Sequence, residues 1–133
     1  MPKVLAVDLG EKRTGFAISD PEGRLALALP TLTGVTPADV ARLAAEQQAE
    51  EVVVGLPLNM SGTEGPAARR ALEFADELRH HLSIPVTMWD ERLSTAEGQT
   101  RLREAGLNRK ERQRRSDVAA AIVILDSYLR RKR

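Results

Sequence analysis

The order of short apolar runs and longer helical periods constrains the fold of this chain more than any other feature. Three runs typical of strands, at 3–9, 14–20 and 24–33, follow one another with only short connections. Residues 20–23 (Asp-Pro-Glu-Gly) form one of these turns, because proline presets φ and glycine accepts a positive φ. The first quarter of the chain is therefore predicted to be an antiparallel, three-stranded meander.

Helices and single strands alternate in the middle of the chain. Residues 36–39 (Thr-Pro-Ala-Asp) predict a helix start, with a hydroxyl cap, a proline at the first helical position and an acid at the third. A strand is predicted at 51–56, a long amphipathic helix from about residue 63 to 82, and a strand at 84–89. Both strands are reached through helical crossovers, so we expect them to run parallel to the first strand.

Two further helices are predicted to close the chain. Residues 94–97 (Ser-Thr-Ala-Glu) fit a capping box, and Gly106 marks the end of the short helix that they start. A polar, basic loop at 108–115 follows, and Ser116 then caps a last helix to about Arg130. The predicted order is βββαβαβαα, which gives a mixed five-stranded sheet flanked by helices in one domain, residues 1–133.

The residue types that are missing or rare exclude several kinds of site. There is no cysteine, which excludes disulfides, thiolate zinc sites and Fe–S clusters, and we expect a cytoplasmic protein without a signal peptide or membrane span. Only four side chains are aromatic: Phe16, Phe74, Trp89 and Tyr128. The core is therefore expected to be aliphatic, and recognition of nucleobases by aromatic stacking is not expected.

Charge is distributed unevenly along the chain. Residues 1–100 carry nine Lys or Arg against fifteen Asp or Glu, whereas residues 101–133 carry eleven against four. A basic segment of this kind fits a polyanionic partner, but it fits the solvated surface of a helix equally well.

Three acids are expected to converge at one edge of the predicted sheet. Asp8 lies near the end of an apolar strand, where an unpaired carboxylate is costly, and Glu91, beside Asp90, ends the last strand. Parallel strands present their carboxyl ends at the same edge, where ligand sites of α/β sheets gather. Asp117 stands in the first turn of the last predicted helix, on the face that continues with apolar residues toward Tyr128.

Clustered carboxylates resist joint ionisation unless a cation neutralises them. Oxygen-only ligands suit Mg²⁺ or Mn²⁺, and two such ions about 3.5–4 Å apart activate a water and stabilise the leaving oxygen of a phosphodiester. The alternative is structural: Asp8 pairs with Arg13 or Arg92, and Asp117 only stabilises the start of its helix. Spacing alone leaves both interpretations open.

Four sequence blocks together resemble a known family. They are residues 7–15 (VDLGEKRTG), 55–62 (GLPLNMSG), 90–95 (DERLST) and 116–121 (SDVAAA). In this order and at these separations they resemble the YqgF family, also called RuvX, over almost the whole chain. The resemblance implies a ribonuclease H-like fold, with a mixed sheet of strand order 3-2-1-4-5 in which strand 2 is antiparallel. It also implies a relation to RuvC resolvases and to maturation of small-subunit ribosomal RNA precursors.

The resemblance assigns metal-ligand roles to Asp8, Glu91 and Asp117. One departure from the wider superfamily stands out, because ribonuclease H and RuvC proteins place an acid on the fourth strand, whereas this strand ends in Gly55-Leu56-Pro57. Glu91 on the neighbouring strand is expected to replace that acid. Asp90 is the alternative ligand, since consecutive strand residues face opposite ways.

Substrate contacts are expected around these acids. Arg13 and Arg92 stand next to them and can hold a phosphate or pair with the acids themselves. Asn59 and Ser61 precede a helix N-terminus, a place that suits a backbone phosphate. The basic loop adds five cations immediately before Asp117: Arg109, Lys110, Arg112, Arg114 and Arg115.

The predicted function is a metal-dependent nuclease acting on structured nucleic acid, in processing of the 5′ end of pre-16S rRNA on ribosomal precursor particles. The first alternative is resolution of four-way DNA junctions, and the second is a nucleic-acid-binding assembly factor without catalysis. A sugar-kinase type of ATPase shares the turn after Asp8 but needs two lobes, for which this chain is too short. The sequence does not decide between a monomer and a homodimer, and no membrane partner is expected.

Overall fold

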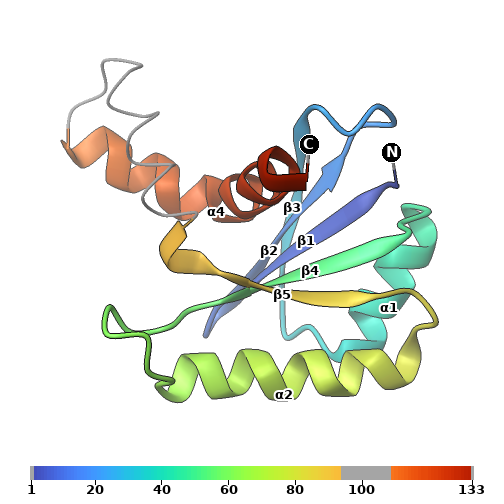
Figure 1. The fold of residues 1–133 in the computed structure, drawn as a ribbon, viewed down its shortest axis with the longest axis horizontal. Coiled ribbons are helices and arrows are strands. Elements are labelled where there is room, and N and C mark those ends of the chain that lie inside the picture. The colour runs from blue at the N-terminus through green and yellow to red at the C-terminus, as the bar shows by residue number, and fades with distance from the viewer. Residues whose placement is uncertain (1, 94–108, 133) are drawn as a thin grey trace.

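The structure, a computed structural model, describes the backbone of residues 2–93 and 109–132, and the side chains of these ranges except 109–119. Figure 1 shows a sheet with helices on both sides. The elements are β1 (Val4–Leu9), β2 (Arg13–Ser19), β3 (Ala26–Thr33), α1 (Pro37–Glu46), β4 (Glu51–Leu56), α2 (Pro66–His81), β5 (Val86–Asp90) and α4 (Arg109–Lys132).

The sheet has the predicted topology. Its five strands lie in the order β3-β2-β1-β4-β5. The meander β1–β2–β3 is antiparallel, and β4 and β5 run parallel to β1, with Val7 beside Val54 and Leu56 beside Asp90. The ends of β1, β4 and β5 at Leu9, Leu56 and Asp90 therefore lie together, and we call this side of the sheet the carboxyl edge.

Local signals placed the turns and the first helix correctly. The Gly23 amide donates to the Asp20 carbonyl oxygen at 3.0 Å, and Gly23 has a φ of 70°. Thr36 caps α1 in a complete capping box with Asp39. Helix α2 begins at Pro66, with Gly65 as its N-cap, rather than at about residue 63. The reason is that the Thr63 hydroxyl is bonded within the preceding loop and Pro66 occupies the first helical position.

The prediction of a basic loop before the last helix is wrong. Helix α4 already begins at Arg109, so residues 109–115 are helical and Ser116 lies inside the helix. This stretch contains no Gly or Pro, and Lys, Arg, Glu and Gln are all good helix formers. The short helix predicted over 94–106 lies outside the described residues.

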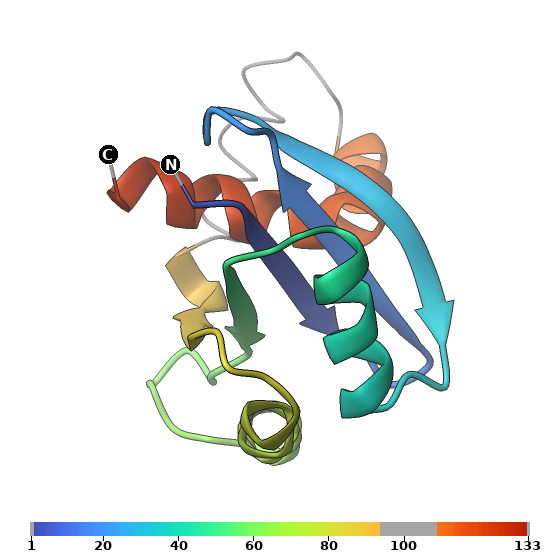
Figure 2. The same ribbon diagram turned by 90° about the vertical axis from the view of Figure 1, so that its right-hand side faces the viewer.

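The helices form two layers around the sheet. Helices α1 and α2 cover one face and α4 crosses the other (Figures 1 and 2). Side chains on β1 alternate between the faces: Leu5 and Val7 pack in the core beneath α1 and α2, whereas Val4 and Ala6 pack beneath α4. As predicted, the described core is mainly aliphatic, with Phe16 and Tyr128 as its buried aromatics.

Polar contacts fix the carboxyl-terminal half of α4 on the sheet. The Tyr128 hydroxyl and the Thr87 hydroxyl both donate to Glu51 Oε2, at 2.5 and 2.9 Å, and Trp89 Nε1 donates to Ser127 Oγ at 3.2 Å. Burial raises the pKa of Tyr128, which keeps its hydroxyl protonated as a donor. These bonds connect α4 to β4 and β5, so the other half of the helix lies at the carboxyl edge. No helix in the described part of the chain is long and apolar enough to cross a membrane.

Candidate active site

Asp8 lies on the α4 face of the sheet at the carboxyl edge. It follows Ala6 on the same face of β1 and stands opposite Gly15 of β2. A Cβ atom on Gly15 would lie 3.8 Å from Asp8 Cβ and 3.7 Å from Ala121 Cβ of α4. The missing side chain at Gly15 therefore brings Asp8 and α4 close together, and burial raises the pKa of the Asp8 carboxyl group.

Glu91 reaches the same face from the end of β5. Residues 91–93 turn into a helical conformation, and the Glu91 carboxyl group then lies over β4 at Gly55. A Cβ atom on Gly55 would lie 3.0 Å from both Glu91 Cδ and Oε2, and 2.7 Å from Ile124 Cδ1. Only glycine leaves the space that this carboxyl group occupies.

The two carboxyl groups repel each other. Burial, then Asp8 and then Asp90 raise the pKa of Glu91 to about 7. Among the described residues, no basic side chain forms an ion pair with Asp8 or Glu91. The structural alternative that Asp8 pairs with Arg13 or Arg92 is therefore not observed.

Two half-buried carboxyl groups without an ion pair among the described side chains are a donor set that fits Mg²⁺ or Mn²⁺, because a hard cation removes their repulsion and takes oxygen ligands. Asp117 lies in α4, but its side chain is outside the described residues. Among the side chains that the structure describes, no group of three or more His, Cys, Asp or Glu has a geometry that could hold a metal ion. The proposed set of three ligands thus depends on Asp117.

Asp90 is engaged elsewhere. Arg92 Nη2 donates to Asp90 Oδ2 at 2.7 Å, Arg92 Nε donates to both carboxylate oxygens at 3.1 Å, and the Arg92 amide donates to Oδ1 at 2.9 Å. Arg92 holds the pKa of Asp90 below its usual value. Of the two adjacent acids, Glu91 is thus the one without an ion pair among the described side chains.

The loop between β4 and α2, residues 57–65, uses most of its polar groups internally. Asn59 Nδ2 donates to Thr63 Oγ1 at 2.9 Å, and the Ser61 and Thr63 hydroxyls are 3.0 Å apart. Arg92 Nη1 reaches the Met60 carbonyl oxygen at 3.3 Å. Asn59, Ser61 and Arg92, all expected to contact substrate, therefore have partners within the protein, and Arg92 joins this loop to the end of β5.

Arg13 is exposed at the start of β2, beside the turn after Asp8. The Gly10 amide donates to the Arg13 carbonyl oxygen at 3.1 Å, and a Cβ atom on Gly10 would collide with that oxygen. The turn thus requires glycine and places Arg13 at the carboxyl edge. The other predicted contacts, Arg109, Lys110, Arg112, Arg114 and Arg115, lie in α4, and their side chains are outside the described residues.

Sequence reasoning missed two exposed arginines in α2, Arg69 and Arg70. They lie in the second turn of the helix, and Arg70 Nη2 is 3.8 Å from Glu11 Oε1 in the turn after β1. The signal was present, because the first turn of α2 has no acid and two adjacent arginines follow it, which is unfavourable for the helix dipole. These cations extend the basic border of the carboxyl edge.

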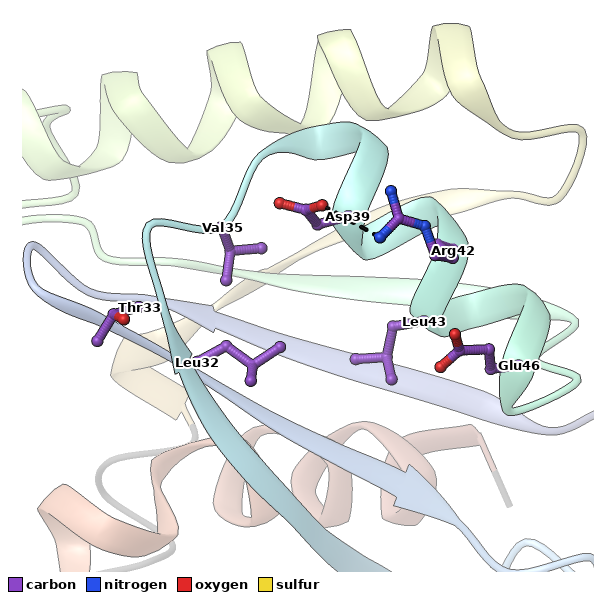
Figure 3. Close-up of a pocket in the computed structure, with 7 residues that line it drawn as sticks. All are labelled: Leu32, Thr33, Val35, Asp39, Arg42, Leu43 and Glu46. Carbon is purple, nitrogen blue, oxygen red and sulfur yellow. Dashed lines mark ion pairs between the residues drawn. The ribbon is translucent and has the colours of Figure 1, made fainter.

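A cavity of about 230 Å³ lies elsewhere, between the end of β3 and α1 (Figure 3). Its lining includes Leu32, Val35 and Leu43, and Asp39 and Arg42 form an ion pair of 3.6 Å at its border. The cavity is on the α1 face of the sheet, whereas Asp8 and Glu91 lie on the α4 face. It is therefore not part of the carboxylate site.

The strand order, the antiparallel β2 and the acids at the carboxyl edge define a ribonuclease H-like protein. The same fold is found in the structure titled "T. thermophilus RuvC in complex with Holliday junction substrate", with a TM-score of 0.67 and 16% sequence identity over 99% of this chain and 96% of that chain. A family profile described as "RuvX: Holliday junction resolvase" matches residues 2–131. The chain belongs to the RuvX family.

Curated relatives are similar in sequence to this chain over nearly its full length. A protein of Anaeromyxobacter sp. (strain K) is 44% identical over 134 residues, covering 98% of each chain. A protein of Syntrophomonas wolfei is 45% identical over 131 residues, covering 96% of this chain and 93% of the relative. Both carry the name "Putative pre-16S rRNA nuclease".

Proposed function

We propose that this protein is a metal-dependent nuclease that hydrolyses phosphodiester bonds in structured RNA, and that it processes the 5′ end of pre-16S rRNA on ribosomal precursor particles. The observation that carries this proposal is the pair Asp8 and Glu91: two half-buried carboxyl groups at the carboxyl edge, without a described basic partner. The names of the relatives support RNA as the substrate.

Asp117 is proposed as the third ligand. Ala121 lies beside Gly15 and Asp8, and residue 117 precedes it by four positions, which is about one helical turn on the same side of α4. The space next to Asp8 is kept free by Gly15, which has no side chain. Two Mg²⁺ or Mn²⁺ ions bound here would supply an activated water and stabilise the charge of the leaving oxygen.

The remaining residues hold the nucleic acid. Arg13, Arg69 and Arg70 give the carboxyl edge a basic border that attracts phosphates. Asn59 and Ser61 form the loop beside it, which Arg92 joins to β5. On the other side of the acids lie the first turns of α4, with Arg109, Lys110, Arg112, Arg114 and Arg115, and of these, positions 110 and 114 fall on the same side of the helix as position 117.

A second candidate function is resolution of four-way DNA junctions. The description of the family that matches residues 2–131 favours it. A third, nucleic-acid binding in ribosome assembly without catalysis, would give the acids a purely structural role. The three functions differ in whether a bond is cut and in which nucleic acid is cut.

A cleavage panel separates them. Purified protein is incubated with Mg²⁺ or Mn²⁺ and either a precursor RNA spanning the mature 5′ end of 16S rRNA or a four-way DNA junction. We expect cleavage of the RNA, and we expect Asp8→Asn, Glu91→Gln and Asp117→Asn each to abolish it while RNA binding persists. Asp76→Asn, on the exposed side of α2, is the control and should cleave normally. Cleavage of the junction alone, or metal-dependent binding with no cleavage of either substrate, contradicts the proposal.

A further inference from the structure

Met60 is an exposed apolar side chain at the carboxyl edge. It is 89% exposed, more than any other large hydrophobic residue in the described part of the chain. It stands in the loop 57–65 that leaves β4 beside the acids. A single exposed apolar residue is ordinary on a protein surface, so the surroundings of Met60 decide whether it has a role.

The loop holds Met60 in a fixed place. The Asn59 amide donates to the Thr63 carbonyl oxygen at 2.9 Å, and the Gly62 amide donates to the Asn59 carbonyl oxygen at 2.8 Å. Gly62 has a φ of 88°, which side chains rarely tolerate, so the turn after Met60 requires a glycine. Together with the side-chain bonds of Asn59 and Thr63, these contacts give a closed turn with Met60 at its tip.

Arg92 connects this tip to the candidate active site. Its Nη1 atom donates to the Met60 carbonyl oxygen at 3.3 Å, while its other nitrogens bind Asp90. Arg92 follows Glu91 directly, so one side chain sets the position of the loop relative to the acids. The backbone of Met60 is thus connected to the end of β5, where Glu91 lies, through the Arg92 side chain.

The chemistry around Met60 points to the kind of partner. Arg13 and Arg69 are exposed at the described border of this edge, beside Arg70, which pairs with Glu11, and these cations suit a polyanion. The four aromatic rings, all in the described residues, are engaged in packing: Phe16 and Tyr128 are buried, Phe74 packs against the core beneath α1 and α2, and Trp89 packs edge-on against Tyr128 at 5.4 Å between ring centroids. The cations suit an anionic backbone, and the exposed Met60 suits a flat apolar surface. A nucleic-acid strand with an unpaired base offers both.

We propose that Met60 contacts the face of an unpaired nucleobase next to the phosphodiester bond that is cut, and so selects substrates with an unstacked nucleotide there. This inference rests on the proposed nuclease function. Methionine is flexible and polarisable, and apolar side chains of this kind insert between or against bases in other nucleic-acid complexes. Arg92 acts as a positioning residue, because it holds the backbone of the loop and not the base.

The test uses a precursor RNA with 2-aminopurine at the unpaired position beside the cleavage site, because this base changes its fluorescence when its stacking changes. Binding is measured with Asp8→Asn protein and Mg²⁺, so that the RNA stays intact. We expect Asp8→Asn to bind and alter the fluorescence. Adding Met60→Ala should weaken binding about tenfold and remove the fluorescence change, whereas Met60→Leu should keep both. Leu25→Ala is the matched control, since Leu25 is 61% exposed at the opposite end of the sheet.

Cleavage kinetics in the wild-type background separate the two proposals. We expect Met60→Ala to raise KM for RNA with an unpaired base and to leave KM unchanged for fully paired RNA. Equal Kd, fluorescence and KM in wild type and Met60→Ala overturn the role of Met60 while the nuclease function stands. A wild-type protein that neither cuts nor binds the RNA overturns both.

Discussion

The Glu91 carboxyl group lies against the backbone of Gly55, in the space that a side chain on β4 would otherwise fill: a Cβ atom there would be 3.0 Å from Glu91 Oε2. The family resemblance predicts that Glu91 replaces an acid on this strand, and the structure shows the Glu91 carboxyl group from the end of β5 lying over Gly55 of β4. The position of the Glu91 carboxyl group therefore depends on the absence of a side chain at position 55.

The first prediction is that Gly55→Ala removes activity. The added methyl group meets Ile124 Cδ1 at 2.7 Å and the Glu91 carboxyl group at 3.0 Å, so the side chains of both Ile124 and Glu91 must shift. Overpacking of this kind costs about 1–3 kcal/mol of stability. We expect a lower midpoint in urea unfolding, weaker binding of Mn²⁺ and loss of RNA cleavage.

Gly15→Ala is the control for the stability of Gly55→Ala. Among the described atoms, a Cβ atom there would meet Asp8 Cβ and Ala121 Cβ, at 3.8 and 3.7 Å, which is ordinary van der Waals contact. We expect it to fold with nearly wild-type stability. Equal stability and equal Mn²⁺ binding in Gly55→Ala and the wild type would show that Glu91 does not depend on the glycine.

Much of the fold could be predicted because the signals are local. Apolar runs, the turn at Gly23 and the capping box at Thr36 each depend on neighbouring residues, and the crossover rule then makes β4 and β5 parallel to β1. The strand order itself followed from the family resemblance. The start of α4 could not be predicted in this way, because the local signal there is ambiguous. A run of charged residues has weak periodicity, and the sequence was read as a loop although helix formers fill it.

The site was predicted less completely, because its geometry is not local. Spacing along the chain brought Asp8 and Glu91 to one edge, and the structure places them together. The sequence could not show that Arg92 binds Asp90 rather than Asp8, because that choice depends on which way two consecutive side chains point after β5 ends. The cations Arg69 and Arg70 were missed because they belong to the edge only when α2 is in place.

The second prediction concerns pH and the metal-free protein. The pKa of Glu91 is raised from 4.5 to about 7, so between these values the folded state binds more protons than the unfolded state. Stability must then fall as pH rises through this range, by at most about 3 kcal/mol. Burial raises the pKa of Asp8 as well, which acts in the same direction.

Urea unfolding in EDTA at pH 5 and pH 8 measures this effect. We expect the wild type to be less stable at pH 8 and Glu91→Gln to lose most of the difference. Mn²⁺ should restore stability at pH 8 but not at pH 5, because it binds the ionised carboxylates. A wild-type protein whose stability rises from pH 5 to pH 8 in EDTA would contradict the charge repulsion between these acids.

The third prediction is that Arg92→Lys loosens the loop 57–65. Lysine cannot bind both oxygens of Asp90 and the Met60 carbonyl oxygen at once, because it lacks the planar fork of arginine. We expect faster hydrogen exchange at the Asn59 and Gly62 amides and little change in global stability, because this ion pair is partly exposed to solvent. The matched control is Arg79→Lys, since Arg79 also binds a carboxylate and a carbonyl, those of Asp76 and Val86, away from the loop. Exchange at the two amides that is unchanged in Arg92→Lys, or equally faster in both variants, would show that Arg92 does not hold the loop.

The fourth prediction uses the finding that residues 109–115 are helical. In a loop all five cations could turn toward the substrate, but helical spacing puts positions 110, 114 and 117 in one row and positions 112 and 115 on the other side of α4. Each phosphate contact adds about 0.7 to 1 to the slope of log Kd against log salt concentration. Replacing Lys110 and Arg114 by Gln should therefore lower the slope for RNA binding by about 1.4 to 2, and replacing Arg112 and Arg115 by Gln should change it little. Both double variants lose the same net charge, so a general electrostatic effect would lower both slopes equally, and that result would exclude a single binding face on α4.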